Sequence, residues 1–163
     1  MYLEEIKAIR GCDRAENERL SGELRDGSMA AKERLIEGNL RTVLEMVQEY
    51  LNRGIQAGDL VQEANMALVL AVAEYEEGDF EAFLRERVRN ALLAAVEEQS
   101  HVEKAAEEML DRVNKLKDVS QEMAEELGRE ASVEELAERM KLTVDEVKEI
   151  MKLTLDAMSV VGD

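Results

Sequence analysis

Hydrophobic residues recur every three or four positions through most of the chain, which is the spacing of one face of an α-helix. The longest such pattern, over residues 29–51, predicts a single long helix that ends at Gly54. Two shorter helices are predicted before it, over residues 2–9 and about 14–25. The first third of the chain is therefore predicted to be a series of helices joined by short turns.

The most apolar segment follows Asp59. Asp59 and Gln62 have the spacing of a capping box, in which side chains hydrogen-bond the free amides of a helix's first turn. The helix behind them, residues 60–75, is apolar on most sides. We therefore expect it in the middle of a helical bundle, with Leu68 and Val72 at the bundle's centre.

Another helix is predicted from about Phe80, after a break at Gly78. Near residue 100 the composition shifts from Ala-, Leu- and Val-rich to Glu- and Lys-rich, and we place a domain boundary there. The fold class expected is all-α: a multi-helix bundle over residues 1–100, followed by a small three-helix domain over residues 101–163.

The last third carries two capping boxes, Ser132 with Glu135 and Thr143 with Glu146. They open two short helices that are joined by two residues, so the pair resembles a helix-turn-helix. The helices span residues 133–140 and about 144–157.

Composition agrees with this fold and limits the function. The 163 residues include no Pro and no Trp, and only 3% are aromatic, which excludes all-β and doubly wound α/β folds. The net charge of −17 opposes nonspecific binding to nucleic acid or anionic lipid. No apolar run approaches the ~20 residues that span a bilayer, and residues 1–10 lack a signal-peptide core. We expect a cytoplasmic protein with no membrane partner.

Catalytic chemistry has little support. His101 is the only histidine and Cys12 the only cysteine, and no Gly-rich phosphate loop or His-Glu-x-x-His motif occurs. Neighbouring carboxylates such as Glu97 and Glu98 point about 100° apart on a helix, so they form a solvated face rather than an acid–base pair. We expect no enzyme, no catalytic residues, no cofactor and no metal site.

The polar stripe on the helix that begins at Asp59 is a stronger candidate for a functional site than any catalytic group. Asp59, Gln62, Glu63 and Met66 lie at offsets of 0, 3, 4 and 7, and so share one side of the helix. One interpretation is an ordinary solvent-facing side with an N-cap. The other is an edge that docks a basic partner helix.

Several runs have distinctive sequences: AKERLIEGNLR at 31–41, YLNRG at 50–54 and DLVQEAN at 59–65. They resemble the core of bacterial RNA polymerase sigma factors, in which the last run typically reads DLIQEGN. The opening YLEEI resembles the short helix that precedes that core. Further runs resemble the family's third conserved region, so the resemblance spans nearly the whole chain in the family's order. These runs are residues 114–116, 126–130 and 134–138.

The resemblance implies a helical promoter-binding domain followed by a three-helix domain. The helix-turn-helix domain that reads the upstream promoter element is expected to be missing after Asp163. The partners implied are RNA polymerase core, promoter DNA and an anti-sigma regulator. Docking is expected on the coiled coil of the polymerase's largest subunit, through Asp59, Leu60, Gln62, Glu63 and Asn65.

The segment that would face DNA departs from the family. Where sigma factors carry a basic, aromatic melting motif ending WWIRQA, residues 78–91 read GDFEAFLRERVRNA, with Glu86 and Arg87 in place of the two tryptophans. This segment contains Arg85, Arg87 and Arg89. We expect them to form the only concentrated positive patch, unless they pair with Asp79, Glu81 and Glu86. In the third region, acidic Glu108 and Asp111 replace the family's His and Glu. The DNA-contact candidates are Phe80, Phe83, Arg85, Arg87, Arg89 and Asn90.

Three hypotheses remain open. The first is a divergent sigma factor that binds polymerase core and directs it to promoters. The second is a polymerase-binding regulator, or sigma mimic, that keeps the docking helix but does not engage DNA. The third is a purely structural helical adaptor.

Overall fold

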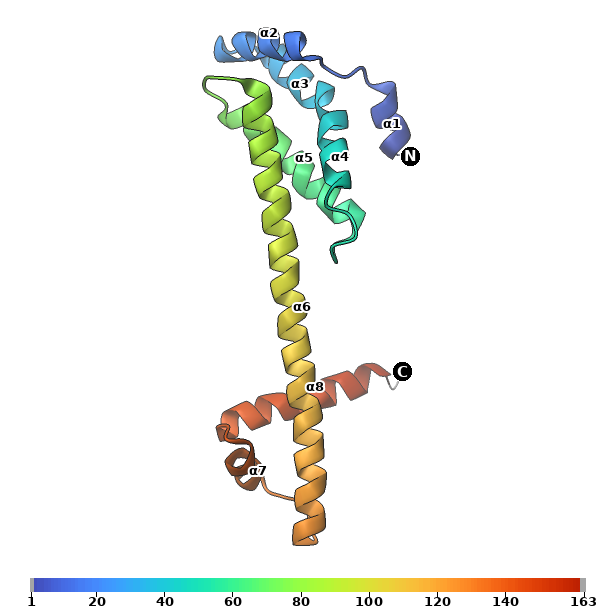
Figure 1. The fold of residues 1–163 in the computed structure, drawn as a ribbon, viewed down its shortest axis with the longest axis vertical. Helices are drawn as coiled ribbons and strands as arrows, with labels where there is room; N and C mark the ends of the chain where they lie inside the picture. The colour runs from blue at the N-terminus through green and yellow to red at the C-terminus, as the bar shows by residue number, and fades with distance from the viewer. Residues whose placement is uncertain (1, 162–163) are drawn as a thin grey trace. The chain divides into compact units, whose positions relative to one another are not determined.

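The computed structural model describes residues 2–161, which form eight α-helices and no strand (Figure 1). The chain divides into two compact units, residues 1–100 and 101–163. The all-α expectation is confirmed. The helices are α1 (Tyr2–Ala8), α2 (Arg14–Arg25), α3 (Met29–Gly38), α4 (Leu40–Gln48), α5 (Ala57–Glu74), α6 (Phe80–Leu127), α7 (Val133–Met140) and α8 (Val144–Val161).

Helix α5 is the centre of the first unit, as its apolar sequence predicted. Figure 1 shows it between α4 and the first part of α6. Leu60, Ala64, Leu68 and Val72 lie on its inner face, and all four are buried in a single cluster with side chains of α2, α3, α4 and α6. Leu68 makes no contact with solvent. The first unit is thus built around one side of α5.

The prediction of one long helix over residues 29–51 is wrong. The helix breaks at Asn39, whose φ and ψ of −110° and 2° separate α3 from α4. Asn39 is buried, and its Nδ2 donates hydrogen bonds to the Leu35 carbonyl (2.8 Å) and to Asn17 Oδ1 (2.9 Å). Asn17 returns a bond from Nδ2 to Asn39 Oδ1 (3.1 Å) and gives another to Glu81 Oε1 (3.1 Å). The break therefore places the Asn39 amide where it can pair with the buried Asn17 amide, and this pair joins α2 to the junction of α3 and α4.

The position just before this break, Gly38, has no room for a side chain. A β-carbon at Gly38 would lie 2.1 Å from Cys12 Sγ. The linker before α2 crosses here, and the Cys12 N–H donates to the Gly38 carbonyl (2.8 Å). Only a glycine allows the linker to approach α3 this closely.

The prediction that Asp59 caps α5 is also wrong. The helix begins at Ala57, and the Gln56 carbonyl accepts the N–H groups of Asp59 (3.1 Å) and Leu60 (3.2 Å). Asp59 therefore lies inside the first turn, where its carboxylate interacts favourably with the helix dipole. The capping-box spacing failed because backbone hydrogen bonds, which leave no mark in the sequence, extend the helix by one turn.

Helix α6 begins at Phe80, as predicted, and continues without interruption to Leu127. It contributes residues to both compact units, although the composition changes near residue 100. The sequence had not predicted that one helix crosses this boundary. Gly128, with φ of +69°, follows its end and supplies the left-handed backbone that glycine adopts readily.

The second unit consists of the end of α6 with α7 and α8. Ser132 and Glu135 form the predicted capping box, with both reciprocal hydrogen bonds present. Thr143 Oγ1 accepts the Glu146 N–H (3.1 Å) at the start of α8, which extends beyond the predicted end near residue 157. Within residues 2–161, no helix has the length and apolar character needed to cross a membrane. The buried core is Leu116, Met123, Leu136, Ala137, Met140, Val147 and Ile150.

Shortening Leu68 tests the position of α5. Leu68→Ala is expected to lower the free energy of unfolding by about 2–5 kcal/mol, because the shorter side chain leaves a cavity in a fully buried cluster. The measurement is urea unfolding followed by tyrosine fluorescence, which reports only the first unit because Tyr2, Tyr50 and Tyr75 are the chain's three tyrosines. Val69→Ala, on the exposed face of the same helix, is the matched control. Equal losses from the two variants would contradict the placement.

Acid should weaken the start of α7. Arg129 donates two hydrogen bonds to Glu135 (2.9 and 3.3 Å), and these, with the Ser132 N–H, lower the pKa of Glu135 from 4.5 to about 2. A lowered pKa means that the stabilisation is complete above about pH 4.5 and is lost as the pH falls toward 2. Carbon NMR titration of the Glu135 carboxyl checks this value. Arg129→Gln should move the pKa upward, and an unchanged pKa would contradict the assigned cause.

Candidate functional site

The polar stripe of α5 faces solvent. Asp59, Gln62 and Glu63 are all exposed, and Met66, one turn further along the same side, is 61% exposed. The two carboxylates lie one turn apart. The structure therefore presents an acidic and amidic edge on a helix whose opposite side is buried.

Two members of the expected docking set are placed differently from the other three. Leu60 is completely buried in the core, so it supports the helix and cannot itself contact a partner. Asn65 is half-buried, and its Nδ2 donates a hydrogen bond to Tyr2 Oη (2.6 Å). Helix α1 thus touches one end of the edge. The surface that α5 offers to a partner consists of Asp59, Gln62 and Glu63, with part of Asn65.

An exposed apolar surface continues the edge along α5. Met66, Val69 and Leu70 are 61%, 44% and 48% exposed. The sequence analysis placed Met66 on the polar stripe, but it expected the rest of this helix, Val69 and Leu70 included, in the middle of the bundle because the helix is apolar on most sides. The sequence did hold a signal for this exposed surface: the helix has more apolar positions than one buried side needs. A bundle that covers a single side of a helix leaves the remaining apolar positions exposed.

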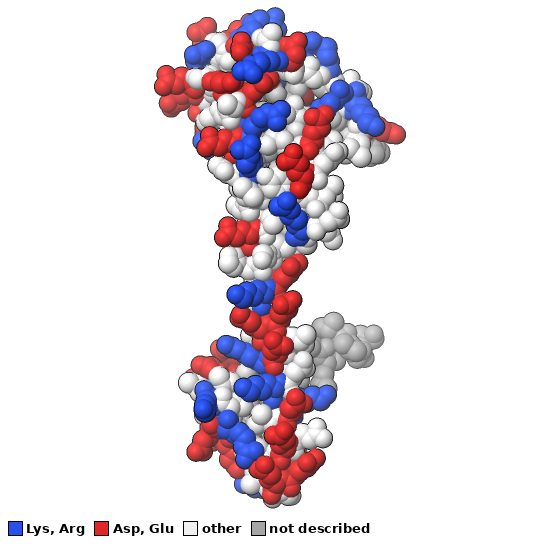
Figure 2. All heavy atoms as spheres, in the orientation of Figure 1, with Lys and Arg blue, Asp and Glu red and all other residues white. Residues whose placement is uncertain are grey.

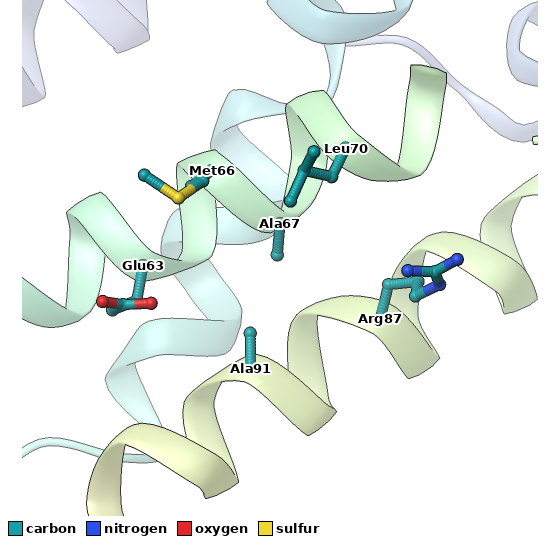
Figure 3. A pocket seen from close by; sticks show the side chains of 6 residues that line it. All are labelled: Glu63, Met66, Ala67, Leu70, Arg87 and Ala91. Carbon is teal, nitrogen blue, oxygen red and sulfur yellow. The ribbon is translucent and has the colours of Figure 1, made fainter. Parts of the chain in front are cut away.

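A cavity of about 160 Å³ lies between α5 and α6 beside this surface. Figure 3 shows Ala67 and Ala91 pointing toward one another from the two helices, with Glu63 and Arg87 at opposite ends. Met66 and Leu70 complete the lining. We call this the α5–α6 groove. It is apolar in the middle, acidic at one end and basic at the other.

Arg87 is fixed in place by its own unit. Its Nη2 pairs with Glu74 Oε2, and its guanidinium lies over the Phe83 ring, 5.1 Å from the centroid. Residues two apart on a helix point roughly 160° apart, so Arg87 does not share a face with Arg85 or Arg89. The expectation of one patch of three arginines is therefore wrong.

The aromatic candidates for DNA contact are largely covered. Phe80 is 1% exposed and packs edge-on against Tyr75, with 5.4 Å between ring centroids, so it is a core residue and not a stacking surface. Phe83 is half-buried, 5.8 Å from the Tyr75 ring and beneath Arg87. Arg85, Arg89 and Asn90 remain exposed on α6. On the face drawn in Figure 2, basic and acidic side chains are interspersed, and no continuous basic surface is visible.

A second group of arginines surrounds Glu16, which the sequence analysis did not find. Arg10 and Arg34 approach its carboxylate to 2.9 and 3.0 Å, and Arg19 to 4.0 Å. The hydrogen bond from Arg34 is the main cause that lowers the pKa of Glu16. Arg34 is 18 residues from Glu16, so spacing could not place it in the group, whereas Arg19 lies one turn from Glu16 on α2. The cluster ties the linker and α2 to α3.

Two family models match the chain, one mainly in each compact unit. The family model described as Sigma-70 region 2 matches residues 35–102, and the one described as Sigma-70 region 3 matches residues 111–161. The chain belongs to the sigma-70 family. The family resemblance inferred from the sequence is thereby confirmed. A curated relative, the RNA polymerase sigma factor SigA of a Bacillus species, is 34% identical over 147 residues. The match covers 88% of this chain, which spans 39% of the relative's length.

The sigma-70 match places the candidate site within one conserved region. The exposed edge of α5, the α5–α6 groove and the candidate DNA-contact residues of α6 all fall within the stretch matched to region 2. Glu108, which the sequence analysis aligned with the family's His, lies between the two matched stretches and is exposed on α6. Asp111, exposed on the same helix, begins the stretch matched to region 3.

Proposed function

We propose that this chain is a transcription initiation protein that binds RNA polymerase core through the exposed edge of α5. The observation that carries the proposal is the pairing of a rigid acidic edge with an uncovered apolar surface on one helix. Ordinary solvent-facing helices are polar throughout, whereas interfaces combine an apolar centre with a charged rim. The relative named as an RNA polymerase sigma factor supports polymerase as the partner.

The chemistry of the edge specifies the partner's surface. Asp59 and Glu63 offer two carboxylates one turn apart, and Gln62 offers an amide between them. A basic helix complements this arrangement, because exposed charges steer association and select a partner of opposite sign. The coiled coil of the polymerase's largest subunit, implied by the sigma resemblance, is the element that we assign to this role.

Charge reversal tests the docking edge. The double variant Asp59→Lys, Glu63→Lys is expected to bind polymerase core about tenfold more weakly or worse, because two attractive contacts become repulsive. Fluorescence anisotropy of the labelled chain against core enzyme measures the affinity. The matched control is Glu45→Lys, Glu49→Lys, which reverses two exposed carboxylates at the same spacing on and just after α4. Helicity should stay unchanged in both variants, and undiminished binding of the first would refute the docking assignment.

A second candidate function is a polymerase-binding regulator that does not open DNA. Burial of Phe80 and coverage of Phe83 favour it, because proteins that hold single strands stack bases on accessible aromatic rings. The sigma-factor hypothesis keeps Arg85, Arg89 and Asn90 as DNA contacts, and these are exposed. The two candidates share the docking edge and differ only in what α6 does.

Titration with single-stranded promoter DNA separates the two candidates. We expect the isolated chain to bind no duplex and to bind single strands weakly at low salt, since the net charge of −17 opposes phosphate. If Arg85 and Arg89 each contact one phosphate, replacing both with Ala lowers the salt slope by about 1.4, at about 0.7 per contact. Lys104→Ala with Lys115→Ala is the charge-matched control on α6.

The same titration in the presence of polymerase core completes the test. Tight, sequence-dependent binding that is lost with Arg85 and Arg89 would establish a DNA-reading sigma factor. No binding even with core present would leave the polymerase-binding regulator.

A further inference from the structure

The two ends of the α5–α6 groove carry opposite charges, and Arg87 at the basic end is paired with Glu74. Glu63 lies at one end and Arg87 at the other, with the small side chains of Ala67 and Ala91 between them (Figure 3). Met66 and Leu70 form exposed apolar walls. A groove of this kind accepts one aliphatic side chain flanked by two charges.

We propose that Arg87 belongs to the polymerase-docking surface and not to a DNA-binding patch. In this arrangement the docked helix places an aliphatic side chain in the groove, a basic side chain at Glu63 and an acidic side chain at Arg87. The inference rests on the proposed function, because it extends the docking edge of α5 onto α6. It also fixes the direction of the docked helix, since reversing that helix would bring like charges together at both ends.

The contacts of Arg87 suit it to receive a carboxylate. Its pair with Glu74 uses Nη2, and the planar guanidinium has further N–H donors for a second acid. Because Glu74 and the Phe83 ring already hold the guanidinium, little side-chain entropy is lost when a partner binds. The side chain is 42% exposed, so a partner can reach it.

The direction of Arg87 argues against a role on DNA together with Arg85 and Arg89. Those two arginines share a face of α6 one turn apart, whereas Arg87 lines the groove with Glu63 and Met66. A phosphate at Arg87 would also lie beside the Glu74 carboxylate and close to the acidic edge. A carboxylate on a docked helix meets the same repulsion from Glu74, but a basic side chain of that helix at Glu63 offsets it.

The experiment measures affinity for polymerase core by anisotropy of the labelled full chain. Arg87→Gln is expected to weaken binding about tenfold, through loss of a charge-assisted contact. Arg89→Gln removes the same charge from the opposite face and should leave the affinity unchanged. Glu74→Gln removes the charge of the internal partner but keeps the arginine and a hydrogen-bond acceptor beside it, so binding should be retained.

A variant that fills the groove tests the apolar part of the proposal. Ala91→Leu is expected to weaken core binding several-fold by occupying the space for the partner's side chain, while Ala94→Leu, on an exposed position of α6, should not. Tyrosine fluorescence and helicity confirm that each variant folds. If Ala91→Leu fails to fold, the Arg87, Glu74 and Arg89 set decides the question alone.

Each outcome has a defined meaning. Unchanged binding by Arg87→Gln overturns the inference, and so does equal weakening by Glu74→Gln, which would show a structural effect of the internal pair. Equal weakening by Arg89→Gln would show a general charge effect and overturn it as well. Loss of docking by Asp59→Lys, Glu63→Lys with no effect of Arg87→Gln refutes only this inference, whereas undiminished docking of that double variant refutes the proposed function itself.

Discussion

The first unit depends on burying one side of α5. Leu60, Ala64, Leu68 and Val72 form that side, and the helices around it contribute the rest of a single cluster. Burial of this side fixes the rotation of α5 about its axis, because turning the helix would expose the leucines and bury Asp59 and Glu63 without partners. The exposed edge is therefore held rigidly by the core beneath it. The same rotation leaves the apolar surface around Met66 uncovered.

The amide pair of Asn17 and Asn39 gives the bundle its second constraint. Asn17 on α2 and Asn39 between α3 and α4 satisfy each other, and Asn17 also reaches Glu81 at the start of α6. A buried amide without its partner costs more free energy than the bond contributes, so the pair favours one arrangement of α2, α3 and α6 over near alternatives. Arg14, paired with Asp79 at 3.1 Å, adds a second tie between α2 and the turn before α6.

Periodicity was sufficient to predict most helices and the centre of the bundle, since burial of one side is what the 3.6-residue repeat records. It could not predict the break at Asn39, because the reason for that break is Asn17, 22 residues away. Motif spacing brought Asp59, Gln62 and Glu63 together, and the structure keeps them together. It grouped Arg87 with the wrong neighbours, because the pair with Glu74 depends on how α5 and α6 pack and not on the order of residues within α6.

Because the linker before α2 lies so close to α3, Cys12 is a probe of the local opening of that linker. Its thiol is half-buried, the pKa of the thiol is raised chiefly by burial, and Sγ fills the space that a β-carbon at Gly38 would need. The side of Sγ that packs against Gly38 is closed to an alkylating reagent, so labelling is expected to be faster when the linker lifts from α3. As the chain's single cysteine, Cys12 would report by its labelling rate how often the linker that leads from α1 to α2 leaves the bundle.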